Sequence, residues 1–175
     1  MLPLDFVAIR KAMVKEVERV TGVTCIMAQP ETQAFPRPPK PYMSMFILNP
    51  AVKVGDDSSR YVSGTTWNIG GQRGMHIDFD AYGRSHEEAY GILCAWQSAL
   101  ETETTQANLR KAGVAVWLNG SVADISELLQ TGYEGRAKLE VQFGIAANIT
   151  EDRSSIDSAS FTGTITTDQD NEVVI

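Results

Sequence analysis

The residues best suited to chemistry lie on one predicted strand, where a histidine and two aspartates alternate with apolar side chains. His76, Asp78 and Asp80 share one face of this strand, about 7 Å from one to the next. A histidine and two carboxylates can bind a divalent metal ion or transfer protons. Metal ligands, however, must converge to within about 2–2.5 Å of one point, and residues in a row do not converge. We therefore interpret them as the polar face of an amphipathic strand.

Other patterns that indicate catalysis are absent from the sequence. It contains no G-x-x-x-x-G-K-[ST], G-x-S-x-G, H-E-x-x-H or C-x-x-C. Cys25 and Cys94 lie in apolar stretches and are interpreted as small buried residues, because two isolated thiols form neither a disulfide framework nor a zinc site. His86 is expected to be a neutral surface residue at a helix start. The sequence therefore indicates no enzyme, cofactor or metal.

The strand with these residues leads directly into an amphipathic helix, and the two elements predict the core. The other face of the strand has the apolar period of two of a half-buried strand and consists of Met75, Ile77, Phe79 and Ala81. After Gly83, Ser85 is placed as the helix N-cap, and Glu88 is placed to complete a capping box. An apolar stripe at steps of three and four residues follows, made of Ala89, Ile92, Leu93, Trp96, Ala99 and Leu100.

The remaining periodicity predicts further helices and strands. Helices are predicted at residues 4–20 and 121–129, and residues 102–111 are either the end of the helix from Ser85 or a second short helix. Strands are predicted at residues 24–27, 42–48, 114–118, 137–150 and 158–166. Gly22 ends the first helix, on which Glu16 belongs to the charged face. In the helix at 121–129, Ser121 is the expected N-cap and Asp124 takes the box position.

Three of these strands also carry predictions about their position. The strand at 42–48 is expected to end at Asn49 and Pro50. The strand at 114–118 has no polar face and is expected to lie centrally in the sheet. The strand at 137–150 is long, which predicts that it bends or extends beyond its own sheet. Its expected inward residues are Leu139, Val141, Phe143, Ile145, Ala147 and Ile149.

Three segments are predicted to lie outside the packed core. Residues 29–41 contain five of the seven prolines, which favours an extended connection over a helix or a central strand. Residues 51–73 interleave glycines with aromatic residues, which predicts a protruding arm, either a β-hairpin or a long loop, suited to a protein contact. Residues 167–175 form a C-terminal tail that is polar and then apolar, and we expect it to dock on a surface.

Together these elements predict an α+β fold in a single domain of residues 1–175. A largely antiparallel (mixed) β-sheet would carry two main helices, at residues 4–20 and from Ser85, packed on one face. The β-hairpin or loop arm would protrude from this body. A chain of this length can bury about two-thirds of the surface that it exposes when unfolded.

Composition and charge exclude several classes of protein. The net charge is −7 and the pI is about 4.8, and lysines and arginines are scattered singly, which disfavours specific nucleic-acid binding. No apolar run approaches the ~20 residues of a membrane span. The first twenty residues spread their charges through the apolar positions, so they do not resemble a signal peptide, and synthesis in the cytoplasm is expected.

The order of these elements resembles that of the tail terminator (tail completion, or neck) proteins of tailed bacteriophages. The resemblance covers about residues 6–149. It is carried by the Pro-Lys-Pro-Tyr run at 39–42, the strand HIDFDAYG at 76–83, the helix through Trp96, and RAKLEV at 136–141. Their order and the size of the chain carry most of the weight.

The resemblance implies a homohexameric ring in the neck of the virion. Such a ring caps the head-proximal end of the tail tube, ends its polymerisation and joins the tail to the head connector or stopper protein. DNA would pass through the lumen without specific binding, which suits an acidic chain, and no membrane is involved. The family offers no catalytic residues, and from their position in the arm we expect Arg60, Tyr61, Trp67 and Arg73 to form protein interfaces.

Two other hypotheses remain open from the sequence. The first is another component of the head-tail connector, such as a head-completion or stopper protein, which also forms rings. The second is a small metal-dependent enzyme that uses His76, Asp78 and Asp80. A head-completion or stopper protein would bind only the portal side, whereas a terminator binds the tail tube. An enzyme would have a metal-dependent activity that alanine at all three positions abolishes without loss of folding.

Overall fold

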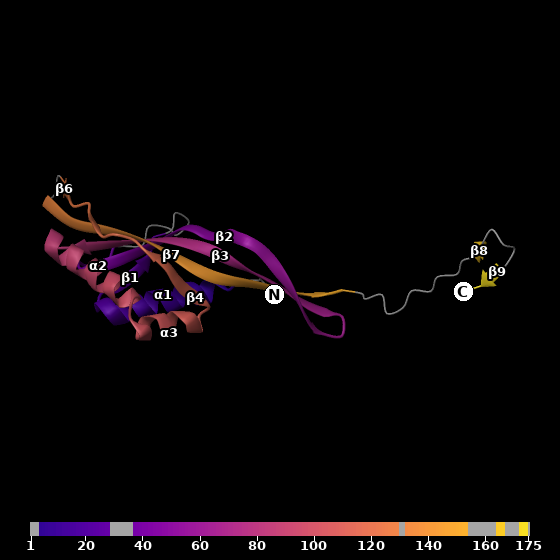
Figure 1. The fold of residues 1–175 in the computed structure, drawn as a ribbon. Helices are drawn as coiled ribbons and strands as arrows, with labels where there is room; N and C mark the ends of the chain where they lie inside the picture. The colour runs from indigo at the N-terminus through magenta and orange to yellow at the C-terminus, as the bar shows by residue number, and fades with distance from the viewer. Residues whose placement is uncertain (1–3, 29–36, 130–131, 154–163, 167–171, 175) are drawn as a thin grey trace.

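The fold is a sheet with helices on one face, seen in a computed structural model that describes residues 4–28, 37–129, 132–153, 164–166 and 172–174. Within these residues, α1, α2 and α3 cover one face of a mixed, largely antiparallel sheet, and a long hairpin extends past them (Figure 1). The predicted α+β fold, with two main helices on one face and a protruding β-hairpin, is confirmed.

Three long strands form the centre of the sheet. β3 (Thr66–Gly83) pairs antiparallel with β7 (Gly132–Asp152) on one side and with β2 (Tyr42–Ser63) on the other. The β3–β7 register runs without a shift along the whole of β3, whereas the β2–β3 register has four shifts. Because side chains alternate between the faces of a strand, the unbroken β3–β7 register keeps each face continuous over its full length.

The shorter strands complete the sheet at its two edges. β1 (Thr24–Met27) pairs parallel with β2, and β4 (Val114–Asn119) pairs antiparallel with β7, which gives the order β1-β2-β3-β7-β4. β5 (Ala123–Asp124) and β6 (Glu127–Leu129) also pair with β7. A separate two-stranded sheet contains β8 (Thr164–Thr166) and β9 (Glu172–Val174).

Side-chain oxygens begin each of the three helices α1 (Phe6–Thr21), α2 (His86–Leu100) and α3 (Glu103–Lys111). The N-caps are Asp5, Ser85 and Thr102, whose side chains accept bonds from first-turn amides. The predicted capping box of α2 is half formed: Ser85 Oγ accepts from the Glu88 amide, but the Glu88 carboxylate accepts from the amide of Arg84 at 2.6 Å. Gly22 ends α1 with φ 70°, as expected of a left-handed cap.

The core lies between the helices and the sheet, and it contains most of the predicted residues. Met75, Ile77, Phe79 and Ala81 of β3 are fully buried, as are Ala89, Leu93, Trp96 and Leu100 of α2. The Phe79 ring lies 5.5 Å from that of Trp96 and 6.4 Å from that of Phe143, between centroids. Burial of aromatic and aliphatic side chains, at roughly 25 cal/mol per Å² of apolar surface, therefore holds α2 against β3 and β7.

The prediction that a strand ends at Asn49 and Pro50 is wrong, because β2 continues to Ser63. The register with β3 shifts between Asn49, which lies opposite His76, and Val52, which lies opposite Gly74. Pro50 falls inside this bulge, where its missing N–H breaks no regular ladder bond.

The prediction of a central strand at 114–118 is also wrong, because among the described strands β4 pairs only with β7 and lies at the edge of the sheet. Trp117 and Leu118 are 38% and 62% exposed. The Trp117 ring lies over Gly144, where a Cβ atom would stand 2.1 Å from the ring. The missing polar face thus reflects an aromatic ring lying on glycine, and not burial on both sides.

The helix predicted at 121–129 is wrong as well, because this segment is extended and contains β5 and β6. The Asp124 carboxylate accepts from the amide of Ser126 at 2.9 Å and from its hydroxyl at 2.6 Å. Such local bonds offer the backbone an alternative to a helix. The Ile125 amide donates to the Arg136 carbonyl instead, which ties the segment to β7.

Some predictions fall partly or wholly outside the described residues. They concern residues 29–36 of the proline-rich connection, 158–163 of the last predicted strand, and 167–171 and 175 of the tail.

In the strand at 137–150, Ile149 was expected to face the core but is 54% exposed. Ile149 lies opposite Ile69 in the β3–β7 ladder, in the part of the sheet that extends past the helices.

Candidate functional site: the charged face and the arm

The charged face of the sheet is the helix-free side that carries His76, Asp78 and Asp80. Each of these residues meets an oppositely charged or ionisable side chain on β7. Lys138 Nζ lies 2.6 Å from Asp78 Oδ2, Arg136 Nη2 lies 3.0 Å from Asp80 Oδ2, and His76 Nδ1 lies 3.7 Å from Glu140 Oε1. The row predicted on β3 thus forms diagonal cross-strand pairs, and within the described residues no group of His, Cys, Asp and Glu is placed to hold a metal ion.

The electrostatics of the charged face follow from these pairs. The hydrogen bond to Asp78 raises the pKa of Lys138, and the negative charge of Asp78 adds to the effect. Burial, the largest single effect, would lower the pKa of Arg136, but the hydrogen bond to Asp80 together with the negative charges of Asp80 and Glu134 outweighs it, so the pKa of Arg136 is raised. Both cations are therefore held charged, and both aspartates already use an oxygen to neutralise them.

Stacked aromatic rings continue the charged face toward β2. Tyr42 and Tyr82 stack with ring centroids 4.6 Å apart, and Tyr42 is only 2% exposed. Burial raises the pKa of the Tyr42 hydroxyl. The Arg136 guanidinium lies over the Tyr82 ring at 5.2 Å, a cation–π contact, and Lys40 Nζ pairs with Glu134 at 2.7 Å. These contacts anchor the end of the Pro-Lys-Pro-Tyr run on the sheet.

The arm consists of residues 51–73 of the β2–β3 hairpin and the opposing residues 146–152 of β7. It extends past the helices as a ribbon (Figure 1). Aliphatic and aromatic side chains along it are largely exposed: Val52, Val54, Tyr61, Val62 and Ile149 are between 42% and 57% accessible. Surface of this kind is typical of protein contacts.

The four residues expected at interfaces all lie on the arm, but they play different parts. Tyr61 and Trp67 contact each other edge to face, with centroids 5.7 Å apart. Arg73 forms two bonds to the Asp57 carboxylate, at 2.7 and 3.0 Å, which lower the pKa of Asp57. Arg60 is exposed and lies opposite Asn68 in the register. The structure thus brings Tyr61 and Trp67 together, while Arg73 is engaged within its own chain.

Arg153 is a residue of the arm tip that sequence reasoning missed. Its guanidinium lies 5.5 Å from the centroid of the Trp67 ring, and its amide donates to the carbonyl of Thr65 at 2.8 Å. Only the pairing of the end of β7 with β3 makes it a neighbour of Trp67. The one available signal was the alternation of β7, which continues past the core as far as Ile149.

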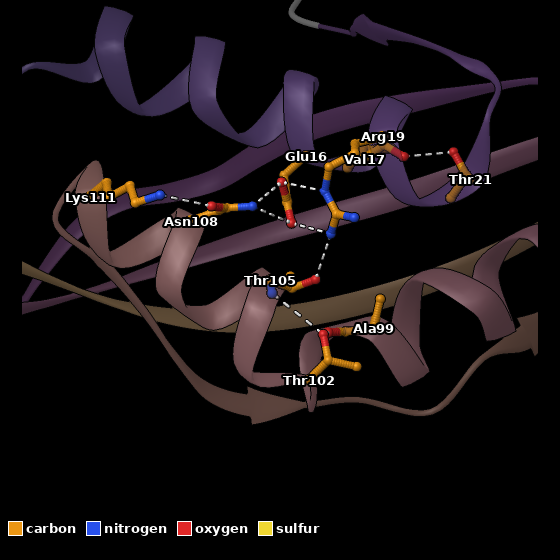
Figure 2. A network of polar contacts seen from close by, with 9 residues as sticks. All are labelled: Glu16, Val17, Arg19, Thr21, Ala99, Thr102, Thr105, Asn108 and Lys111. Carbon is orange, nitrogen blue, oxygen red and sulfur yellow. Dashed lines mark hydrogen bonds and ion pairs between the residues drawn. The ribbon is translucent and has the colours of Figure 1, made fainter.

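A polar network between α1 and α3 was also missed (Figure 2). Glu16 is 4% exposed, contrary to its expected place on the charged face. Its carboxylate accepts from Arg19 at 2.6 and 3.0 Å and from Asn108 at 3.2 and 3.4 Å, and Arg19 also donates to Thr105 Oγ1 at 3.1 Å. The hydrogen bond from Arg19 lowers the pKa of Glu16. The network stabilises the helical layer and offers no open site.

Comparison with known families decides what kind of protein this is. A family model described as phage neck terminator protein matches residues 8–170. The chain belongs to the phage neck terminator family. The match includes α2, α3 and all three strands of the arm, and membership makes the chain a structural component of the neck and tail end of a phage particle.

One solved structure similar to this neck terminator protein is a cryo-EM structure of the anti-feeding prophage cap, described as a tube-terminating cap. It has 16% sequence identity over 91% of the chain, with a TM-score of 0.52. At this identity the likeness shows a shared fold. The chain spans 62% of the length of that cap. No curated protein matches the sequence.

Proposed function

We propose that this terminator-family protein assembles as a homohexameric ring on the head-proximal end of the tail tube, where it ends tube polymerisation and joins the tail to the head connector or stopper protein. The observation that carries the proposal is the arm. Most of its length lies beyond the helices, yet its strands carry exposed aromatic and aliphatic side chains along the ribbon. A monomer gains little from such a surface, whereas a ring built from head-to-tail contacts needs one on each subunit.

The proposed division of the chain follows from this role. Residues 1–175 act as one terminator-like domain, and residues 51–73 act as the arm that reaches a neighbouring subunit or the tube. Tyr61 and Trp67 are the proposed anchors of the contact, since aromatic residues dominate the binding energy of protein interfaces. Arg60 adds a charge at the rim, and Arg73 acts through Asp57 by keeping the arm ordered.

The charge of the chain supports a passive lumen for DNA. With a net charge of −7, a ring of this protein repels the phosphate backbone and lets it slide. The cations of the charged face are paired with Asp78 and Asp80, so they form no basic track. We propose that the ring binds no DNA sequence, contacts no membrane, needs no cofactor and joins the virion after synthesis in the host cytoplasm.

Electron microscopy of particles made by a phage that lacks only this chain tests the function. Tails of uncontrolled length beside separate, filled heads are expected. Tails of normal length that fail to join heads would instead assign the protein to the head side of the neck, as a head-completion or stopper protein. Intact virions would overturn both structural roles.

The enzyme hypothesis has its own test, in the variant with alanine at His76, Asp78 and Asp80. The ion pairs of Asp78 and Asp80 with β7, and the contact of His76 with Glu140, argue for a structural role. We expect the purified wild-type protein to carry no stoichiometric metal by elemental analysis, and the triple variant to lose stability without losing any metal-dependent activity. A bound metal ion that the triple variant lacks would contradict the structural assignment.

A further inference from the structure

A groove runs along the outer side of α1 beside the edge strand β1. Its volume is about 370 Å³. Val7, Val14 and Met27 supply its apolar side chains, and Arg10, Lys11, Lys15 and Glu18 are its charged ones. Val7 is 52% exposed. Among the described strands, β1 is the last on this side of the sheet, so the groove borders a strand edge that a docked segment can cover.

The charges of this groove favour an acidic occupant. Three of its four charged residues are cations, and the one anion, Glu18, already accepts a hydrogen bond from the Cys25 amide at 3.1 Å. In the described part of the chain, Lys11 and Lys15 form no ion pair. An occupant that combines acidic and aliphatic residues would therefore complement both the charge and the apolar surface.

The chain itself contains a segment with this composition. Residues 154–175 include no lysine, arginine or histidine, and their acidic residues are Asp157, Asp168, Asp170 and Glu172. Two valines follow Glu172 directly within β9. β8 and β9 pair with each other, apart from the main sheet. Because an isolated two-stranded hairpin is marginally stable in water, this hairpin requires a surface on which to pack.

The path of the chain points to the groove of another copy. Arg153 is bound to Thr65 at the arm tip, so the chain leaves the sheet there. Met27, in the groove, is in register with Leu139 of β7 through β2 and β3. Leu139 lies about 43 Å from Asp152 at the rise of a β-strand. The connection from Arg153 to Thr164 spans at most about 36–40 Å even when straight, so it falls short of the Met27 end of its own copy's groove. The Val7 end lies nearer the arm, because the neighbouring Ala8 and Ile9 line a hollow with Ile145 and Ala146. A second copy, in contrast, can present the whole groove to the hairpin.

We propose that the β8–β9 hairpin of one subunit docks in the α1–β1 groove of a second copy of this chain, with its acidic residues toward Lys11 and Lys15. The contact would link each subunit of the proposed ring to the next, in addition to any contact made by the arm. It rests on the proposed function only in requiring that copies of the chain assemble.

Disulfide trapping between two distinguishable copies tests this contact. In a Cys94→Ser background, one tagged full-length copy carries Val14→Cys in the groove and a second carries Asn171→Cys between the hairpin strands. Burial raises the pKa of Cys25 to about 12, which keeps that thiol unreactive. Mild oxidation of the co-expressed copies should give a disulfide-linked heterodimer. As a control, Glu87→Cys, at an exposed position of α2, replaces Val14→Cys, and the yield of the heterodimer should fall at least about tenfold.

Two results of the trapping experiment would overturn the proposal. One is a heterodimer yield no greater than that of the Glu87→Cys control. The other is a disulfide that forms only when both cysteines lie in the same chain, which would mean that the hairpin occupies the groove of its own copy. Circular dichroism of each variant confirms beforehand that the cysteine copies are folded.

Charge reversal at the groove is a second, independent test of the contact. Lys11→Glu with Lys15→Glu should weaken self-association about tenfold, the scale expected when several surface charge pairs become repulsive. Adding Asp168→Lys, Asp170→Lys and Glu172→Lys to the same chain should restore it, and failure to do so would contradict the contact. Tail length in a phage that carries Lys11→Glu with Lys15→Glu separates the two proposals. Tails of normal length, together with no disulfide trapping, would contradict the hairpin contact and leave the proposed terminator function intact.

Discussion

The body and the arm are two regions of one sheet that differ in what covers them. In the body, Met75, Ile77 and Phe79 of β3 are fully buried beneath the helices. The same unbroken register continues into the arm, where Ile69 and Trp67 occupy the same face. There the residue opposite Ile69, Ile149, is 54% exposed. The strands are alike, and the difference comes from α1, α2 and α3.

Alternation along a strand therefore specifies a face but not its burial. The body gains its stability from apolar surface removed from water by its own helices. The arm keeps a comparable pattern without a cover, so its apolar surface can be buried only by another molecule. Substitutions in the body should therefore act on folding, and substitutions in the arm should act on assembly.

The largest effect is expected from Trp96→Ala in the body. Trp96 is fully buried against Phe79, and removing so large a side chain costs about 3–5 kcal/mol of unfolding free energy. Urea or thermal denaturation followed by circular dichroism measures this loss. The matched control in the arm is Val62→Ala, at an exposed position, which should change stability by less than about 0.5 kcal/mol. Equal losses at the two sites would contradict the comparison.

A smaller loss is expected from Glu16→Gln, which changes the network between α1 and α3. Weakened bonds from Arg19 and Asn108 should cost about 1–3 kcal/mol at pH 7. The pKa of Glu16 is lowered in the folded state, so the stabilisation is present above the unfolded pKa of about 4.3. It is lost as the pH falls through the folded value. Unfolding measured from pH 7 to pH 3 should show the two proteins converging, and a constant difference would refute this assignment.

In the arm, the variant with both Tyr61→Ala and Trp67→Ala should fold but fail to assemble. Their edge-to-face pair contributes only about 0.5–1.5 kcal/mol to the monomer. Light scattering coupled to size exclusion should find the wild type as a ring and the variant as a monomer. Tyr90→Ala, at an exposed aromatic position of α2 outside the arm, serves as the control, and a double variant that still forms rings would show that Tyr61 and Trp67 are not the anchors.

The smallest effect on stability is expected from Asp57→Asn. Arg73 and Lys53 both pair with this carboxylate at the surface, and surface pairs contribute little and are screened by salt. The bonds from Arg73 lower the pKa of Asp57, so its small stabilisation is lost as the pH falls through that lowered value. A melting temperature that differs from the wild type only at low ionic strength is expected. A difference that persists in 1 M salt would contradict a purely electrostatic role.

Local patterns in the sequence were sufficient to predict much of the body. The alternation of Met75 through Ala81 and the stripe of α2 are short-range signals, and both place residues in the core. The prediction failed where a distant partner determines the outcome. Glu16 is buried because Arg19 and Asn108 donate to its carboxylate, and Thr105 accepts a bond from Arg19. Trp117 lies on Gly144 because β4 pairs with β7.

The same limit applies to the candidate site. Glycines and aromatic residues were enough to predict the arm and to select Tyr61 and Trp67. Nothing local predicts that Asp57 would bind Arg73, or that Arg153 would lie over Trp67, because both contacts depend on strand register. The α1–β1 groove likewise arises from two elements whose packing the sequence alone does not determine.

The uneven ladders of the arm have a mechanical consequence. Within the arm the hydrogen-bonded register is continuous on the β7 side of β3, whereas on the β2 side it is interrupted twice, between Val54 and Ser58 and between Tyr61 and Ser63. Bulges add local bending and twist, so the ribbon should be compliant toward β2 and stiff along β3–β7. A tensile load along the arm would act on the continuous ladder in shear, where many bonds share the force. The arm should therefore bend toward β2 while it transmits longitudinal force along β3 and β7 to the body.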